Sequence, residues 1–308
     1  MPELPEIETV RLQLQKHLVG EEIARLEKLH AKSVQGNLRL VEGKKITAIE
    51  RKGKMLVIDL EKDICLAIHF KMSGQLILVT QPSHKASAGN ESVKRKAGSR
   101  KDEIKNRIVG GHPSEDWLGK LPSKHTRAVF HLKSGDTMYF NDQRIFGWVK
   151  ILSKKELEEL PFVKDLGPEP WDLSDSQFYK LISSRKKAIK LVLMDQSIIS
   201  GVGNIYANDA LWEANIHPQT AANKLKPEET KELRIGLIKV LKEGIKYGGA
   251  TAADAKYIDL DGLGGHYQDH FRVYDREGKN CLRRDDGVIK KVTLGGRGTY
   301  YCPKCQVG

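Results

Sequence analysis

The 308-residue chain has only four cysteines and no long hydrophobic run. Four cysteines are too few for a disulfide scaffold, and nothing approaches the ~18 consecutive apolar residues needed to span a bilayer. The first six residues are acidic rather than basic and lead into no apolar core, so we expect no secretory signal. Acidic residues are also the minority among charged ones, with 40 Asp and Glu against 52 Lys and Arg, a net charge of +12. This excess favours a nucleic-acid partner, although a ribosome-associated protein or a merely basic surface would also fit.

Hydrophobic residues make up 39% of the chain and charged residues 30%, a balance that supports packed cores. The length indicates about two domains, given a usual size of roughly 100–200 residues each. After Pro5, apolar residues recur at Ile7, Val10, Leu14 and Leu18, which predicts one face of a helix. Short alternating runs then predict an antiparallel sheet or sandwich, with strands at 45–50, 55–60, 64–70, 75–79, 128–132, 137–140 and 147–151.

The stretch 82–121 interrupts this strand pattern. It is rich in Lys, Arg, Ser and Gly and has few large apolar residues, which predicts a mobile basic insertion. A proline-rich segment at 161–170 predicts the end of the first domain. From Ser174, which forms a predicted capping box with Gln177, the apolar spacing becomes helical. Further helices are predicted at 185–194, 204–214 and 227–247, followed by Gly-rich loops and a short β-ribbon.

Three of the four cysteines, Cys281, Cys302 and Cys305, lie close to the C-terminus, whereas Cys65 lies alone in an apolar run. In a reducing compartment, clustered cysteines bind a metal more often than they pair with each other. The C-terminal ribbon is therefore a candidate metal site.

Several motifs follow one another along nearly the whole chain. They are MPELPEIETV at 1–10, Lys54 after Gly53, HFKMSG at 69–74, NDQRIFG at 141–147, LGPEP at 166–170, GVGNIY at 201–206, VYDREG at 273–278, GRGT at 296–299 and CPKC at 302–305. Together they resemble the formamidopyrimidine-DNA glycosylase family, whose relatives include endonuclease VIII. Leu4, where the endonuclease VIII branch has a glycine, favours the branch that acts on formamidopyrimidines and 8-oxoguanine.

The resemblance implies an α+β multidomain fold. An N-terminal antiparallel β-sandwich with a flanking helix would occupy residues 1–152, including the basic insertion at about 82–121. A linker at 153–173 would lead to a helical helix–two-turn–helix domain at 174–265, and a zinc-finger-like β-ribbon would occupy 270–308. The implied activity is that of a bifunctional DNA glycosylase and AP lyase of base excision repair. Such an enzyme excises oxidised purines from duplex DNA through an N-terminal proline Schiff base and cleaves the strand by β,δ-elimination.

Pro2 is the nucleophile that the resemblance implies. Removal of Met1 would leave a secondary amine, and because an α-amino group titrates near ~8, a useful fraction is neutral at physiological pH. Glu3 resembles the general acid that protonates the sugar ring oxygen, and Glu6 a helper that orders a water or the amine. Taken without the resemblance, both carboxylates would simply favour the N-terminus of a helix.

Lys54 and Arg297 complete the implied catalytic set. Lys54 resembles the lysine that reaches the phosphate and assists β-elimination, and Arg297 resembles the arginine that grips phosphates and is assigned the δ-elimination step. An arginine can fork onto a phosphate with two charge-assisted hydrogen bonds, which a lysine cannot imitate.

Further DNA contacts are implied by resemblance. Positions that face phosphates are His69, His125, Lys186, Lys190 and Asn204; for a lone basic residue, a solvated surface side chain is the alternative. Met72, Arg144 and Phe146 match residues that occupy the space left when the target nucleotide is everted. From the local pattern alone, Met72 and Phe146 would be core residues.

The finger departs from the family pattern of two Cys-x2-Cys pairs. Arg284 stands where the second ligand is expected after Cys281, and an arginine stays protonated and cannot bind a metal. One Zn²⁺ is implied, but a closed structural site needs four ligands and only Cys281, Cys302 and Cys305 remain. We therefore expect weakened or absent zinc, unless Asp285 or Asp286 supplies the fourth ligand.

The expected partner is damaged double-stranded DNA, bound by a monomer in the cytoplasm of a bacterial-type cell, with no membrane involved. Two alternatives stay open at this stage. One is an oxidised-pyrimidine glycosylase similar to endonuclease VIII, and the other is a catalytically silent DNA-binding protein.

Overall fold

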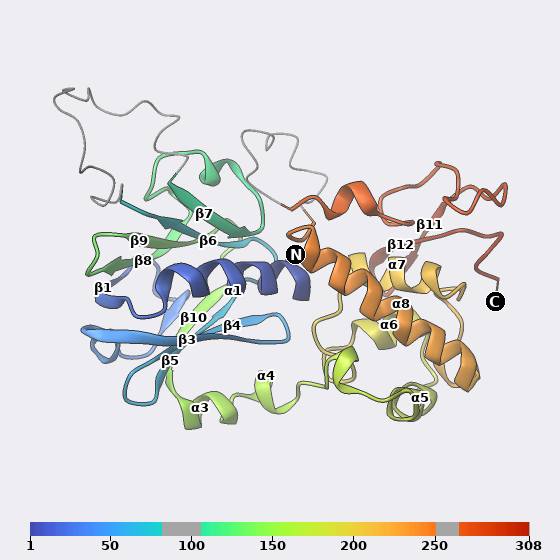
Figure 1. The fold of residues 1–308 in the computed structure, drawn as a ribbon, viewed down its shortest axis with the longest axis horizontal. Coiled ribbons are helices and arrows are strands. Elements are labelled where there is room, and N and C mark those ends of the chain that lie inside the picture. The colour runs from blue at the N-terminus through green and yellow to red at the C-terminus, as the bar shows by residue number, and fades with distance from the viewer. Residues whose placement is uncertain (82–105, 251–264, 308) are drawn as a thin grey trace, which may run out of the picture.

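A computed structural model describes residues 1–81, 106–250 and 265–307 of the chain. Figure 1 shows two lobes, one built on a β-sheet and the other on helices with a short ribbon, and the N-terminus lies between them. Helix α1 (Leu4–Leu18) runs along the first lobe and begins at its border with the second. The fold is α+β, as the sequence predicts.

The sheet of the first lobe has ten strands among the described residues, in the order β2-β10-β5-β4-β3-β1-β8-β9-β6-β7. Neighbouring strands are antiparallel except β2 and β10, which are parallel. All seven strands expected from the alternating pattern are present, and β1, β2 and β7 were not predicted. The strands are β1 (Glu22–Lys28), β2 (Val34–Gln35), β3 (Lys44–Lys52), β4 (Met55–Leu60), β5 (Ile64–His69), β6 (Gly74–Val79), β7 (Arg107–Gly111), β8 (Thr126–Leu132), β9 (Thr137–Asp142) and β10 (Trp148–Ser153).

The core of this lobe lies between the two halves of the sheet. Leu56 and Ile58 from one half and Phe130 and Phe140 from the other share one buried cluster, which the apolar face of α1 joins. Strand β4 is buried along its whole length because its alternate residues enter a second cluster, under α3 (Lys154–Glu159) and α4 (Pro161–Lys164). The segment expected as a linker is thus folded against the sheet.

The expected basic insertion needs a correction. Its residues 82–105 lie outside the described part of the chain, but Arg107–Gly111 form β7, an edge strand paired with β6. Arg107 is buried, and its guanidinium donates hydrogen bonds to the carbonyls of Trp117 and Gly119. Residues 107–117 are therefore part of the fold and not a solvated loop, because Arg107 finds backbone acceptors and Trp117 is itself buried.

The second lobe contains α5 (Asp175–Ser183), α6 (Ile189–Met194), α7 (Asn204–Glu213), α8 (Pro227–Lys246) and the ribbon of β11 (Lys290–Leu294) and β12 (Arg297–Tyr301). The capping box of Ser174 and Gln177 at the start of α5 is confirmed. Helix α6 begins four residues later than expected. Short 3-10 helices are η1 (Leu38–Leu40), η2 (Glu115–Trp117), η3 (Pro170–Asp172), η4 (Ala222–Lys224) and η5 (Tyr267–His270). In the described part of the chain no helix is long and apolar enough to cross a membrane.

Candidate active site and nucleic-acid interface

The start of α1 connects the two lobes. The backbone N–H of Glu3 donates to the Glu6 carboxylate at 2.7 Å, which closes the first turn of the helix. The backbone N–H of Leu4 donates to the carbonyl of Gly201 at 3.0 Å, and the Leu4 side chain lies in the core of the second lobe. Residues 2–6 are all buried, so the N-terminus is held by both lobes.

The Gly201–Asn204 loop is the second element of the site. At Gly203 a Cβ atom would lie 2.3 Å from the carboxyl carbon of Glu3, and at Gly201 it would lie 2.4 Å from Leu4. The side chain of Gln196 clamps the loop, since it accepts the N–H of Gly201 and donates to the carbonyl of Val202. The glycines are therefore explained by the close approach of α1.

The Glu3 carboxylate lies at the N-terminus of α7. One oxygen accepts the backbone N–H of Ile205 at 2.9 Å, and the other has no hydrogen-bond partner among the described residues. Burial raises the pKa of Glu3, and Glu6 raises it further, whereas Lys54 and the Ile205 N–H oppose the rise. The N–H of Ile205, in the first turn of α7, therefore holds a carboxyl group.

Lys54 is buried in the loop between β3 and β4, and its amine donates to the carbonyl of Val202 at 2.7 Å. Burial lowers its pKa to about 8; Arg297 adds to the lowering, while Glu3 and Glu6 oppose it. Burial also lowers the pKa of the Met1 amine. Lys54 and Arg297 add to this lowering, while Glu3 and Glu6 oppose it. The N-terminal amine, Glu3, Lys54 and Arg297 are therefore close enough to influence one another's charge, as expected of a common site.

Arg297 lies at the tip of the ribbon. Gly295 and Gly296 have φ values of 57° and 72°, the left-handed turn that joins two strands tightly and that glycine adopts without strain. Arg297 follows this turn as the first residue of β12, and its side chain is exposed. The hairpin therefore presents an exposed guanidinium that lowers the pKa of both buried amines.

Glu6, in the first turn of α1, is bonded to the second lobe. One of its carboxylate oxygens accepts the Tyr206 hydroxyl at 2.8 Å and the backbone N–H of Ala250 at 2.7 Å. A cavity of about 320 Å³ opens beside it, between α1, β7 and the residues around Gly248. Among the described residues, Glu6 is the member of the candidate catalytic set that lines this cavity.

Arg51 and Glu169 were not anticipated from the sequence. The Arg51 guanidinium forks onto the Glu169 carboxylate, also donates to Glu8 at 2.9 Å, and reaches the carbonyl of Gly53 at 3.0 Å. Both partners are largely buried, with side-chain exposures of 8% and 14%. The pair ties the loop that carries Lys54 to the LGPEP segment, and the only signal in the sequence was that Glu169 lies inside that motif.

The loop that carries Arg144 and Phe146 is hydrogen-bonded to Ser73, the residue after Met72. The Asp142 carboxylate accepts hydrogen bonds from the Ser73 hydroxyl at 2.5 Å and from the backbone N–H groups of Arg144 and Gly147. The Arg144 guanidinium lies 5.0 Å from the centre of the Phe146 ring, and the Phe146 side chain is 54% exposed. Phe146 is therefore a surface residue and not a core residue. Its ring is accessible, as a contact with DNA requires.

The two histidines differ from each other. His69 is buried against Trp148 and Phe162, and its Nδ1 accepts the N–H of Lys71. Burial lowers the pKa of His69 to about 3, so it carries no positive charge near neutral pH. His125 is half-exposed, and its Nδ1 lies 2.8 Å from the Asp116 carboxylate.

Lys190 is not on the surface where a phosphate contact was expected. Its amine is fully buried and donates to the carbonyl of Gly298 at 3.0 Å and to the Thr299 hydroxyl at 2.6 Å. The amine is bonded inside the protein because the ribbon covers α6, and the DNA contact stays a prediction. Lys186 is exposed and Asn204 is half-buried at the first position of α7.

The cysteines of the ribbon lie together with one carboxylate. Single ligand atoms of Cys281, Asp285, Cys302 and Cys305 all lie within 4.8 Å of one another. Three sulfurs and one oxygen in such a cluster fit a structural zinc ion, and Arg284 is exposed outside it. Asp285 therefore lies at the gap expected in the ligand set, and Cys65, buried in β5, belongs to another core.

Comparison with known proteins gives the same identification throughout. Residues 1–149 match the formamidopyrimidine-DNA glycosylase N-terminal domain, 166–256 its H2TH domain, and 286–307 a zinc finger found in FPG and IleRS. The formamidopyrimidine-DNA glycosylase of Pelotomaculum thermopropionicum is 36% identical over 99% of both chains, and that of Chloroflexus aurantiacus is 35% identical over 100% of this chain and 98% of its own. The Lactococcus lactis Fpg bound to abasic-site DNA is 29% identical, with a TM-score of 0.78 over 99% of this chain and 100% of its own. The chain belongs to the formamidopyrimidine-DNA glycosylase family.

Proposed function

We propose that this protein is a bifunctional DNA glycosylase and AP lyase that removes oxidised purines from duplex DNA and then cleaves the strand by β,δ-elimination. It would act as a monomer in the bacterial cytoplasm. The observation that carries the proposal is the electrostatic cluster of the N-terminal amine, Glu3, Lys54 and Arg297, which come from both lobes.

The nucleophile in this proposal is the nitrogen of Pro2. In the chain as it begins with Met1 that nitrogen is part of an amide, so Met1 must be removed first. The freed amine would inherit the surroundings that lower the pKa of the Met1 amine, and its neutral form would attack C1′ of the deoxyribose. The bond from C1′ to the base breaks, the base leaves with a proton, and the amine loses its single proton as the iminium forms.

Glu3 is proposed as the acid that protonates the ring oxygen when the C1′–O4′ bond opens. A carboxyl group can do this only if it still holds a proton, and burial raises its pKa in that direction. Because the iminium nitrogen of proline has no proton to lose, it stays cationic and accepts electrons. The C2′ proton can then be removed and the 3′ phosphate expelled.

Lys54 and Arg297 are proposed to stabilise the phosphates that leave. The buried Lys54 lowers the pKa of the N-terminal amine, and the exposed Arg297 guanidinium could fork onto phosphate oxygens. The cavity beside Glu6 is the place we propose for the everted base, and at about 320 Å³ it is a small ligand site. Met72, Arg144 and Phe146 would fill the vacated stack.

Borohydride trapping tests the proposal. Two duplexes are compared, one with 8-oxoguanine and one with a preformed abasic site, and the wild-type protein is expected to form a covalent adduct with both. Glu3→Gln should be trapped on the abasic duplex only, because base release is already complete there, whereas the exposed control Glu159→Gln should behave like the wild type. Absence of any adduct from the wild type would remove the lyase mechanism.

A duplex with dihydrouracil separates the purine from the pyrimidine preference. The Lactococcus lactis Fpg has been solved with an oxidised-pyrimidine DNA as well as with a Fapy-dG DNA, so both lesions merit the comparison. We expect faster excision of 8-oxoguanine than of dihydrouracil, and the opposite order would favour the endonuclease VIII type of activity.

A further inference from the structure

We propose that Asp285 is a zinc ligand in this protein and that the ribbon holds one Zn²⁺ in a Cys₃Asp site. The family pattern has two Cys-x2-Cys pairs, but here the first pair is replaced by Cys281 and, four residues later, Asp285. The matched zinc-finger segment starts at residue 286 and so does not include this first turn. The inference concerns metal binding alone and does not depend on the proposed enzymatic activity.

The separations between the ligand atoms agree with a tetrahedral ion. With Zn–S bonds of about 2.3 Å and Zn–O bonds of about 2.0 Å, two sulfurs lie roughly 3.8 Å apart and a sulfur and an oxygen roughly 3.5 Å apart. The Cys281 and Cys305 sulfurs are 3.9 Å apart, and the Cys302 sulfur is 3.4 Å from an Asp285 oxygen. A disulfide would need sulfurs in bonding contact at about 2.05 Å, and all three cysteines are free.

The turn that carries Asp285 is shaped to insert one extra residue. Arg284 and Asp286, on either side of it, both have left-handed backbones with φ values of 56° and 57°. Such conformations cost about 1 kcal/mol or more for residues with side chains and persist where the surrounding structure fixes them. They leave Arg284 and Asp286 exposed and Asp285 turned toward the sulfurs.

Gly287 closes this turn over the ligands. Its N–H donates to the Asp285 carboxylate at 3.0 Å, and its carbonyl accepts the N–H of Cys281 at 2.8 Å. A Cβ atom at Gly287 would lie 2.3 Å from the Cys302 sulfur and 2.8 Å from an Asp285 oxygen. The backbone therefore orients the carboxylate and leaves no room for a side chain at the site.

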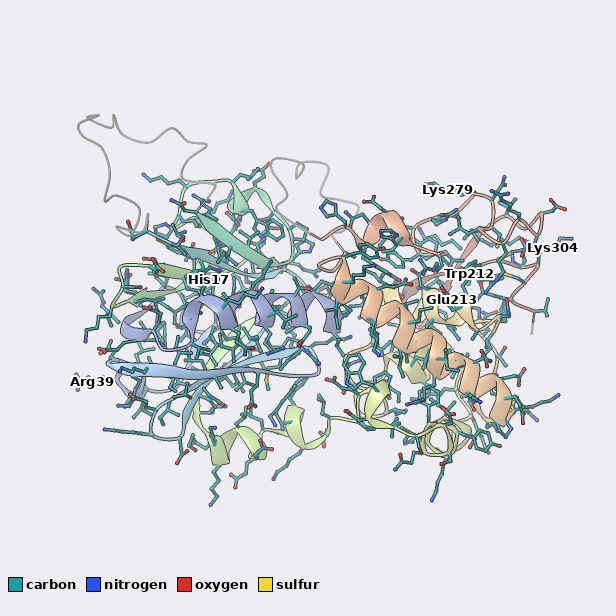
Figure 2. All side chains as sticks on the ribbon, viewed as in Figure 1. His17, Arg39, Trp212, Glu213, Lys279 and Lys304 are labelled. Carbon is teal, nitrogen blue, oxygen red and sulfur yellow. The ribbon has the colours of Figure 1, made fainter. Side chains whose placement is uncertain are left out.

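Two side chains outside the ligand set donate to the sulfurs. The Trp212 indole N–H lies 3.4 Å from the Cys281 sulfur, and the Arg283 guanidinium lies 3.2 Å from the Cys305 sulfur. Arg283 also stacks on the Trp212 ring at 3.7 Å and donates to the Trp212 carbonyl on α7, where Figure 2 labels that residue. Three thiolates and a carboxylate around Zn²⁺ carry a net charge of −2, which Arg283 reduces by one.

The test compares zinc retention in the full-length protein. The wild type should retain one zinc per chain after dialysis, and X-ray absorption at the zinc edge should give three sulfur neighbours and one oxygen. Asp285→Asn keeps the shape but loses the charge, so zinc should transfer to a chromogenic chelator roughly tenfold faster or more. Asp286→Asn is the matched control, since Asp286 is exposed beside the site, and it should transfer zinc at the wild-type rate.

Asp285→Cys provides a second, independent measurement. With cobalt in place of zinc, the thiolate-to-metal charge-transfer band should be one third stronger than in the wild type, because four thiolates replace three. The proposal fails if the purified wild type holds no zinc, if its zinc has no oxygen neighbour, or if Asp285→Asn releases zinc no faster than Asp286→Asn.

Discussion

Neutralising Glu169 should lower the free energy of unfolding and slow the cleavage of an abasic duplex, because this carboxylate holds the loop of Lys54. Arg51 reaches Glu169 across the border between the sheet and the segment that leads to the second lobe. The same guanidinium donates to the carbonyl of Gly53, the residue before Lys54. In Glu169→Gln the side chain keeps its length and one acceptor oxygen, so the change removes charge with little change of volume.

The size of the effect follows from the burial of the pair. Breaking a fully buried ion pair by removing one partner costs about 3–5 kcal/mol. Here Arg51 remains paired with Glu8, and the substituted amide still accepts one hydrogen bond, so we expect a loss of about 2 kcal/mol, similar to one charged hydrogen bond. In a protein of 308 residues, with an unfolding entropy of about 2.1 cal/mol/K per residue, that corresponds to a fall in Tm of about 3 °C.

Calorimetry of the full-length protein measures the first consequence, and cleavage of an abasic duplex measures the second. The matched control is Glu158→Gln. Glu158 pairs with Lys52, which lies next to Arg51 on β3, but the Glu158 side chain is 62% exposed. An exposed pair contributes about 1 kcal/mol at most, so this control should lower the Tm far less. Equal unfolding of both variants, or a normal cleavage rate in Glu169→Gln, would refute the role assigned to Arg51.

Three further predictions concern the site itself. Burial lowers the pKa of Lys54 to about 8 in the free protein, and contact with a phosphate should raise it. DNA binding should therefore take up a proton near pH 8, and the affinity should fall as the pH rises. Calorimetry in buffers of different ionisation heat would measure this uptake, which Lys54→Met should abolish. Gly203→Ala should displace the Glu3 carboxylate and stop excision of 8-oxoguanine while cleavage of an abasic duplex persists, whereas Glu159→Gln, at an exposed position, should change neither rate. Arg297→Ala should lower the slope of log affinity against log salt by about 1, so that the loss is larger at low salt; an unchanged slope would mean that the ribbon does not meet phosphate.

The elements with regular apolar spacing were predictable from the sequence. Helix α1 and strand β4 follow their patterns closely because each buries a continuous apolar face. Strand β7 was missed because its pattern is weak: it contains two glycines and one buried arginine. Such a strand owes its position to pairing with β6, which lies far away in the sequence. A segment rich in charged residues can therefore be predicted to be solvent-exposed only if those residues find no hydrogen-bond partners inside the protein, and Arg107 does find them.

The candidate site was predictable in its residues but not in its contacts. The motifs named Pro2, Glu3, Lys54 and Arg297, and the structure brings their surroundings together. The burial of Lys190 under the ribbon could not be inferred, because a lysine in an amphipathic helix has the same pattern whether its amine meets water or a carbonyl. The sequence also left undecided whether Asp285 or Asp286 faces the cysteines. That choice depends on the left-handed backbones of Arg284 and Asp286, which the composition does not reveal.

The contacts of Glu3 explain how one carboxyl group can be held in place and still keep a proton. A carboxylate bonded to several N–H groups at a helix N-terminus would be stabilised in its ionised form and would be a poor acid. Glu3 receives a single N–H, from Ile205, and its other oxygen is buried without a partner among the described residues. The one hydrogen bond fixes the orientation of the group, whereas burial, together with the nearby charge of Glu6, raises its pKa. A variant that supplied a second donor to that oxygen would bind the carboxylate more firmly and make it a weaker acid, so tighter packing at this point would reduce base excision.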